Sequence, residues 1–259
     1  MALLFTAYVG VVLLLAAGSL RLLLAIVPDG PRANRLARAW TRALIRASGC
    51  RVRLTGAIPS SGGAVVCVSN HESYIDSLIL LATLPADFRF VANHGVLDIP
   101  VIGTVLRKAG HLTVDRGSKD AQLACGEAMT AALSDGVSLI VYPEGTRAGS
   151  GGMLPFRLGA FRAAVEAGRP IVPVTLLGTR RVLAPDEWLV RRGPIDVVVH
   201  EPIAPASSDR AEMSRLRSLA RARIASALDG GPSSEVPREA DDREGGRRLD
   251  ERYDHADVR

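Results

Sequence analysis

The segment AVVCVSNHESYIDSLILLAT, residues 64–83, contains a change from strand to helix on which the predicted fold is built. Its first six residues are apolar or small, which is typical of a buried strand. Ser73 and Asp76 form an S-x-x-D pattern ahead of an apolar run. This pattern predicts a helix over residues 74–83, with Ser73 at its N-cap and Asp76 three positions on. His71 then lies in the loop that joins the strand to the helix.

The alternation of strands and helices continues through residues 51–229 and predicts an α/β fold. Strands are expected at residues 52–55, 64–69, 88–92, 111–114, 138–142, 171–176 and 195–200. Further helices are expected at residues 99–108, 119–133, 160–167 and 210–228. Strands separated by crossover helices imply a largely parallel central sheet covered by helices on both faces. Functional residues of such sheets gather where strands end, and His71 and Glu144 both follow predicted strands.

Residues 1–27 predict a membrane anchor helix. There is no charged residue from Ala2 to Leu20, and the apolar character resumes after Arg21. About 20 such residues cover the hydrocarbon core of a bilayer, which is ~30 Å thick. A secretory signal peptide is the alternative, but no positive charge precedes the apolar run and no small-x-small cleavage site precedes the folded part.

Residues 28–50 predict a basic amphipathic helix that lies at the membrane interface. Leu36, Trp40, Leu44 and Ile45 fall near one helical face, and five arginines are distributed around the rest. An ordinary surface helix is the alternative interpretation. The arginines follow the apolar segment, so the positive-inside rule places the remaining chain on the cytoplasmic side of the cell membrane.

Charge and composition restrict the class of partner. The chain has 259 residues, 47% hydrophobic residues, a mean hydropathy of +0.17 and a net charge of +5. Residues 230–259 carry six Arg against nine Asp plus Glu, so residues 1–229 carry +8. A basic folded part favours anionic lipid or a phosphate-bearing substrate. Nucleic acid is the other interpretation, but only 4% of residues are aromatic and no nucleic-acid motif is present.

The composition also bears on order and on metal binding. Residues 230–259 are rich in Gly, Pro, Ser and mixed charge, which predicts a disordered tail. The three cysteines are widely spaced and form no CxxC pair, so we expect neither a disulfide framework nor a metal site.

His71 and Asp76 are candidates for a catalytic base and its partner. Histidine titrates near neutral pH and is the usual side chain for taking a proton from an alcohol. A carboxylate commonly holds the other ring nitrogen. From the loop, His71 can turn back toward Asp76. The alternative is that Asp76 only caps the helix. No G-x-S-x-G nucleophile motif is present, so a catalytic His71 would activate the substrate hydroxyl directly.

Tyr142-Pro143-Glu144-Gly145-Thr146-Arg147 follows another predicted strand and is a candidate anion site. Arg147 offers a planar fork that suits a phosphate or carboxylate, and Glu144 is expected to orient this arginine or the acceptor. A surface Glu-Arg pair at an ordinary turn is the alternative. Asp115-Arg116, after residues 111–114, is by itself typical of a solvated turn.

Together these segments resemble the glycerolipid acyltransferase family that includes the 1-acylglycerol-3-phosphate acyltransferases. The four blocks of that family are N-H-x-S-x-x-D, a strand ending in D-R, F-P-E-G-T-R and V-P-V. They are met here by Asn70 to Asp76, by Val114-Asp115-Arg116, by Tyr142 to Arg147 with Tyr in place of Phe, and by Val172-Pro173-Val174. Pro155 to Phe161 also looks like the family's P-F-K-x-G-x-F, with Arg157 in place of Lys.

The resemblance implies an O-acyltransferase that moves a fatty acyl chain from acyl-CoA or acyl carrier protein to a lysophospholipid, giving phosphatidate. It implies His71 as the base and Asp76 as its partner. The residues it implies for substrate binding are Asn70, Ser73, Arg116, Glu144, Gly145, Thr146 and Arg147. The partners are then membrane lipids, the lysophospholipid acceptor and the acyl thioester. No cofactor beyond this co-substrate is implied.

One departure from the family bears on the acceptor. Many members carry a K-x-E-L-like stretch whose lysine helps to hold phosphate, and this chain has Asn93 there. Glycerol 3-phosphate, a lyso-aminolipid or another lysolipid therefore remains an alternative acceptor. A non-catalytic lipid-binding membrane protein is the alternative from another class, against which the presence of both His71 and Asp76 argues.

Overall fold

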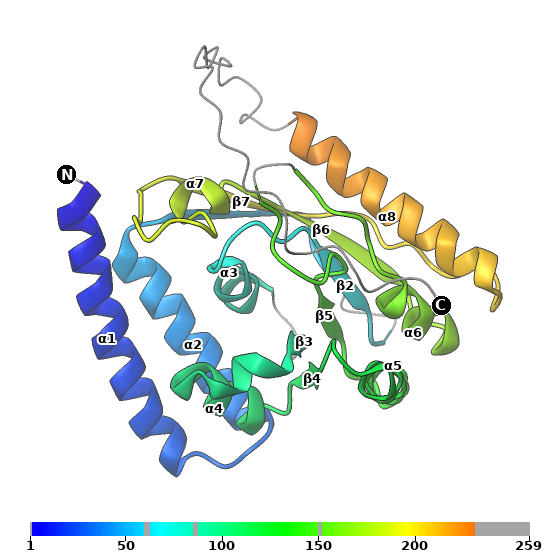
Figure 1. Ribbon diagram of the computed structural model, residues 1–259, viewed down its shortest axis with the longest axis horizontal. Helices are drawn as coiled ribbons and strands as arrows, with labels where there is room; N and C mark the ends of the chain where they lie inside the picture. The colour runs from blue at the N-terminus through cyan, green and yellow to red at the C-terminus, as the bar shows by residue number, and fades with distance from the viewer. Residues whose placement is uncertain (1, 60–62, 85–87, 150–151, 231–259) are drawn as a thin grey trace, which may run out of the picture.

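The computed structural model describes residues 2–59, 63–84, 88–149 and 152–230 (Figure 1). The longer helices are α1 (Ala2–Ile26), α2 (Pro31–Ser48), α3 (Asp76–Thr83), α4 (Pro100–Lys108), α5 (Lys119–Ser134), α6 (Gly159–Glu166) and α8 (Arg210–Gly230). Two short helices are η1 (His94–Asp98) and α7 (Thr179–Val182). The strands are β1 (Arg51–Thr55), β2 (Val66–Ser69), β3 (Arg89–Asn93), β4 (Leu112–Val114), β5 (Leu139–Val141), β6 (Ile171–Leu177) and β7 (Pro194–Val199).

The seven strands form one sheet in the order β1-β7-β6-β2-β5-β3-β4. Every neighbouring pair is parallel except β6 and β7, which are antiparallel. This confirms the predicted largely parallel α/β fold. The sequence pattern did not predict η1 and α7, because helices of one turn carry too few residues to show a helical period.

The central strands are buried on both faces, as parallel strands between helices must be. Val66 and Val68 of β2 join a cluster with α5, α6 and α8, whereas Cys67, between them, faces a second cluster that includes α3. Side chains alternate along a strand, so one apolar run supplies both cores. Figure 1 shows α5, α6 and α8 on one side of the sheet and α2 and α3 on the other.

Helix α1 lies along α2 in the opposite direction (Figure 1). Tyr8 Oη donates to the Ala47 carbonyl oxygen over 2.9 Å, and Trp40 Nε1 donates to the Ala16 carbonyl oxygen over 2.8 Å. Leu20 and Leu24 pack against Ala33. Residues 3–26 are long and apolar enough to cross a membrane, a property that a signal sequence shares, and most of their surface is exposed.

Helix α2 packs against both α1 and α3, and its predicted place at a membrane interface stays a prediction. Arg38 is buried and donates to the Leu84 carbonyl oxygen. Arg42 Nε donates to the Ala82 carbonyl oxygen over 2.7 Å. These bonds tie α2 to the end of α3, and the buried guanidinium of Arg38 needs such an acceptor in place of water.

The predicted disordered tail begins at residue 230, but Gly230 is the last residue of α8. Residues 231–259 lie outside the described part of the chain.

The parallel strands β2, β5, β3 and β4 end at one edge of the sheet. The residues that follow them therefore come together there: His71 after β2, Glu144 after β5 and Arg116 after β4.

Candidate active site

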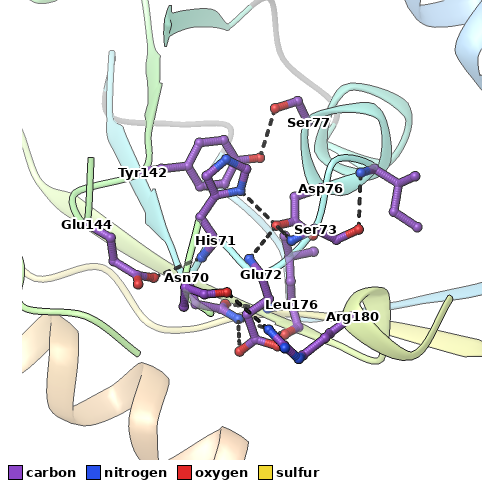
Figure 2. A network of polar contacts seen from close by, with 12 residues as sticks. Asn70, His71, Glu72, Ser73, Asp76, Ser77, Tyr142, Glu144, Leu176 and Arg180 are labelled. Carbon is purple, nitrogen blue, oxygen red and sulfur yellow. Dashed lines mark hydrogen bonds and ion pairs between the residues drawn. The ribbon is translucent and has the colours of Figure 1, made fainter. Parts of the chain in front are cut away.

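His71 and Asp76 meet as the sequence predicted (Figure 2). The His71 Nδ1 and Asp76 Oδ2 atoms are 2.8 Å apart, the imidazole is 14% exposed and the carboxylate is fully buried. A carboxylate at Nδ1 accepts the ring proton, so the lone pair is left on Nε2. No partner for Nε2 is found among the described residues. This is the tautomer and the exposure that a general base requires.

The start of α3 differs from the predicted capping box. The helix begins at Asp76 with Ile75 at the N-cap, instead of beginning at Tyr74. The backbone N–H groups of Glu72 and Ser73 both donate to Asp76 Oδ2, over 2.8 and 2.9 Å. Asp76 therefore organises the loop and the imidazole together, which combines the two alternatives that the sequence left open.

Tyr142 lies flat against the imidazole of His71 (Figure 2). The ring centroids are 4.0 Å apart and the planes differ by 15°. Ser77 Oγ donates to Tyr142 Oη over 3.3 Å. Burial raises the pKa of Tyr142 well above its ordinary value, so the ring remains a neutral phenol. The stack restricts rotation of the imidazole about its side-chain bonds.

Glu144 was predicted to orient Arg147 or the acceptor; its carboxylate holds backbone groups in the structure, and its effect on the acceptor stays a prediction. Its two carboxylate oxygens accept from the N–H of His71, over 2.9 Å, and from the N–H of Leu154, over 2.8 Å. The Ala148 N–H donates to the His71 carbonyl oxygen over 2.8 Å. Burial raises the pKa of Glu144 to about 7, against the opposing effect of these N–H bonds. The loop after β5 thus holds the backbone of His71 on both sides.

Asn70 and Ser73 lie in the framework of the site, which differs from their predicted contact with substrate. Both side chains are fully buried. Asn70 exchanges two hydrogen bonds with the backbone of Leu176, of 2.9 and 2.8 Å, and so continues the pairing of β2 with β6. Ser73 Oγ donates to the Leu183 carbonyl oxygen. These two residues fix the loop that carries His71.

Three arginines, Arg116, Arg147 and Arg157, form the basic side of the site. The guanidinium of Arg147 lies 3.9 Å from the centroid of the Tyr74 ring. The pKa of Arg116 is lowered by partial burial and then by the positive charges of Arg157 and Arg147. Within the described ranges, none of these three arginines forms an ion pair. Thr146 is exposed beside them. Unneutralised guanidinium groups at one edge suit a phosphate group.

A pocket of about 210 Å³ opens beside these arginines. Arg116, Arg157, Tyr142 and Gly145 line it together with an apolar floor. The floor consists chiefly of Val91, Val114, Cys125, Met129, Val141 and Ala160. A pocket with cationic and apolar walls suits a ligand that is anionic at one end and apolar at the other.

Three contributions to the site were not predicted. Tyr142 was known only as a substitution within a block, and its contact with His71 depends on two strand ends meeting in the sheet. Arg157 was recognised in a motif but was not assigned to the site. Arg180 Nη1 donates to the carbonyl oxygens of Ala148 and Gly149, over 3.1 and 2.7 Å, and so holds the loop after β5. No sequence pattern around Arg180 predicts this contact.

Comparison with known proteins agrees with this geometry. Residues 50–177 match the family model described as Acyltransferase. A chloroplastic 1-acyl-sn-glycerol-3-phosphate acyltransferase of Arabidopsis thaliana is 34% identical over 173 residues, which is 66% of this chain and 47% of that protein. The alpha form of the human 1-acyl-sn-glycerol-3-phosphate acyltransferase is 34% identical over 180 residues, which is 65% of this chain and 63% of that protein.

A solved structure is also similar. The crystal structure of the 1-acyl-sn-glycerophosphate acyltransferase PlsC of Thermotoga maritima matches with a TM-score of 0.73 at 23% identity, and the match covers 88% of this chain and 94% of that one. This likeness shows the fold. The chain spans about half the length of the plant relatives it matches. Residues 50–177, which contain the four blocks in order, therefore match the acyltransferase family model, and the relatives over this part of the chain are named 1-acyl-sn-glycerol-3-phosphate acyltransferases.

Proposed function

We propose that this protein is an O-acyltransferase that moves a fatty acyl chain from an acyl thioester to the free hydroxyl of 1-acylglycerol 3-phosphate, giving phosphatidate. The observation that carries the proposal is the His71–Asp76 pair, whose Nδ1–Oδ2 distance is 2.8 Å, beside three arginines without an acidic partner in the described part of the chain. The names of the relatives favour the same acceptor.

The reaction needs a base but no protein nucleophile. His71 Nε2 takes the proton from the acceptor hydroxyl while that oxygen attacks the carbonyl carbon of the thioester. The tetrahedral intermediate collapses with cleavage of the carbon–sulfur bond, and the imidazolium returns the proton to the leaving thiolate. Asp76 stabilises the imidazolium in between. Acyl-CoA or acyl carrier protein supplies the thioester, and the chemistry requires no metal ion or other cofactor.

The basic side of the site binds the phosphate of the acceptor in this proposal. Arg116 and Arg147 supply charge-assisted hydrogen bonds. Glu144 and Gly145 act indirectly, since Glu144 holds the backbone of His71 and Gly145 lines the pocket. Thr146 is exposed at the same turn and can reach the acceptor.

The protein works at the cytoplasmic surface of the cell membrane in this proposal, with α1 embedded along one leaflet. α1 lies against α2 from Tyr8 to Leu24. If α1 crossed the bilayer, α2 would carry its exposed arginines, Arg32, Arg35, Arg42 and Arg46, into hydrocarbon. Each would cost about 3 kcal/mol at the centre of the bilayer. Lying along the surface avoids this cost and keeps the site near lipid substrates.

A second acceptor is considered because of one observation. Asn93 stands where many family members carry a phosphate-holding lysine, and its side chain already accepts the Gly95 N–H over 2.9 Å. Glycerol 3-phosphate, a lyso-aminolipid or another lysolipid would then be the acceptor of the same reaction.

An acceptor panel tests the proposal. Purified protein is mixed with one acyl-CoA and, in turn, 1-acylglycerol 3-phosphate, glycerol 3-phosphate, lysophosphatidylethanolamine and monoacylglycerol, and both thiol release and lipid product are measured. We expect 1-acylglycerol 3-phosphate to give the highest kcat/KM. A higher value for another acceptor would reassign the substrate. If no acceptor gives thiol release, the panel is repeated with an acyl carrier protein thioester; absence of thiol release with this donor too would favour a non-catalytic lipid-binding protein.

A further inference from the structure

Arg157 lies directly over the turn that carries Gly145. A Cβ atom added at Gly145 would lie 2.7 Å from Arg157 Nε and 3.1 Å from its Cδ. Gly145 has a φ of 79°, which also favours glycine. The Arg157 N–H donates to the Pro143 carbonyl oxygen over 2.8 Å, so the backbone on both sides of this contact is held. Because residue 145 has no side chain, the Arg157 side chain can lie against this turn without a clash.

Arg157 and Arg116 line the same pocket from different elements. Arg116 follows β4, whereas Arg157 comes from the loop before α6. Their charges interact, since Arg157 is the largest charged contributor to the lowered pKa of Arg116. Two like charges held together without a described acidic partner are unfavourable until an anion binds between them.

Other arginines near this helix are neutralised. Arg162 lies in α6, and its Nε is 2.6 Å from Glu166 Oε1. Arg215 of α8 is paired with Glu212. Arg157 differs from these two neighbours, because it lines the pocket and forms no ion pair in the described part of the chain.

The wall formed by β3 and β4 contributes one cation to this edge. Asn93, the last residue of β3, is paired in register with Val114, two residues before Arg116. Its neutral side chain accepts the Gly95 N–H. Arg147 is stacked on Tyr74. Arg116 therefore shares the pocket with a second arginine, Arg157.

We propose that Arg157, together with Arg116, binds the phosphate group of the acceptor. Arg157, in the loop before α6, then supplies the positive charge that the neutral side chain of Asn93 does not provide. The proposal rests on the proposed function, because it deepens the choice of acceptor for the same site. Arg157 is then a determinant of specificity for phosphate-bearing lysolipids.

The test compares Arg157→Gln with the matched variant Arg162→Gln, which removes a charge from the neighbouring helix α6, outside the lining of the pocket. For Arg157→Gln we expect the KM for 1-acylglycerol 3-phosphate to rise at least tenfold, with kcat within about twofold. Turnover of monoacylglycerol, which has no phosphate, should be unchanged. Arg162→Gln should leave both acceptors unaffected. An unchanged KM in Arg157→Gln, or equal losses with both acceptors, would overturn the proposal.

A rescue variant adds a second readout. Asn93→Lys places an ammonium group at the end of β3, beside Arg116, so the double variant Asn93→Lys/Arg157→Gln should recover most of the lost affinity. If the double variant has no higher affinity for the acceptor than Arg157→Gln, a cation at residue 93 does not substitute for Arg157 and the proposal is overturned.

Equilibrium binding of 1-acylglycerol 3-phosphate in detergent micelles, without a thioester donor, separates this proposal from the proposed function. If the wild-type protein transfers no acyl chain but binds this lipid, and Arg157→Gln weakens binding tenfold, the phosphate site stands while the reaction does not. Equal binding by both proteins would overturn the phosphate site whatever the activity.

Discussion

The two sides of the candidate site are built differently. On the His71 side, buried protein groups already satisfy one another: Asp76 accepts three hydrogen bonds through one oxygen, and Glu144 accepts two. On the arginine side, Arg116 and Arg157 face a pocket and have no acidic partner in the described chain. The first side is preorganised for chemistry, whereas the second is completed only by a ligand. Substitutions on the first side should lower kcat, and substitutions on the second should raise KM.

Replacement of His71 by alanine should have the largest effect, because it removes the imidazole that Asp76 holds as the proposed base. We expect kcat to fall by a factor of about 10³, within the range that general bases supply. The measurement is thiol release from acyl-CoA in the presence of 1-acylglycerol 3-phosphate. Flotation with anionic lipid vesicles should be unchanged and serves as the control for folding and membrane binding. Retention of full turnover would exclude His71 as the base.

Replacement of Asp76 by asparagine tests the partner of the base. The amide oxygen can still accept the backbone N–H groups of Glu72 and Ser73, but the charge that stabilises the imidazolium is lost. We expect kcat to fall about 10²-fold or more, with a smaller change in KM. Asp76 Oδ1 is buried without a described partner, so the amide nitrogen meets no acceptor there and a modest loss of stability should accompany the change. A larger rise in KM than fall in kcat would contradict this role.

Replacement of Glu144 by glutamine should lower kcat about tenfold by loosening His71. One amide oxygen cannot serve both N–H groups, so either the His71 or the Leu154 N–H loses its acceptor, at about 1–3 kcal/mol. Thiol release and thermal unfolding should therefore change together. If Glu144 instead touched the acceptor, KM would change without loss of stability.

The same residue should make the free energy of unfolding depend on pH. The pKa of Glu144 is about 7 in the folded protein, above the ordinary 4.5, because burial disfavours the carboxylate. Between these values the folded state keeps a proton that the unfolded state has lost, so this stabilisation is complete below pH 4.5 and is lost as pH rises through 7. Denaturant unfolding at several pH values should show a smaller loss toward alkaline pH for Glu144→Gln than for the wild type. Parallel curves would refute the raised pKa.

Replacement of Arg147 by alanine should have the smallest effect on the chemical step. We expect the KM for phosphate-bearing acceptors to rise about tenfold and kcat to stay within about threefold, since the guanidinium contributes charge on the ligand side. Steady-state kinetics with 1-acylglycerol 3-phosphate and monoacylglycerol provide the comparison. An unchanged KM for every phosphate-bearing acceptor would remove Arg147 from the phosphate site.

Local patterns predicted much of this molecule. Each predicted strand of the sheet was confirmed within two residues at either end, because apolar runs bounded by turn residues are a short-range signal. The meeting of His71 and Asp76 was also predictable, since Asp76 follows His71 by only five positions. The start of α3 was predicted too early, because the carboxylate of Asp76 accepts from Glu72 and Ser73 in a turn before the first helical residue.

The contacts of α2 with α3 could not be predicted from the sequence pattern. The arginines of α2 indicated a basic interfacial helix or an ordinary surface helix, and neither interpretation included the bonds of Arg38 and Arg42 to carbonyl oxygens at the end of α3. A charge pattern indicates which residues can face water, but it does not indicate which carbonyl groups of another helix will lie close to them. For the same reason, Asn70 was predicted to contact substrate although it pairs with Leu176, which is 106 residues away.

The amino-acid sequence therefore sufficed for the α/β class, for the meeting of His71 with Asp76, and for the resemblance to the acyltransferases, because each rests on residues close together along the chain. The stack of Tyr142 on His71, the hold of Glu144 on the backbone of His71, and the convergence of Arg116 with Arg157 required the folded sheet. These contacts join loops that follow different parallel strands, and the order of strands in the sheet, which no local pattern encodes, brings the loops to one edge.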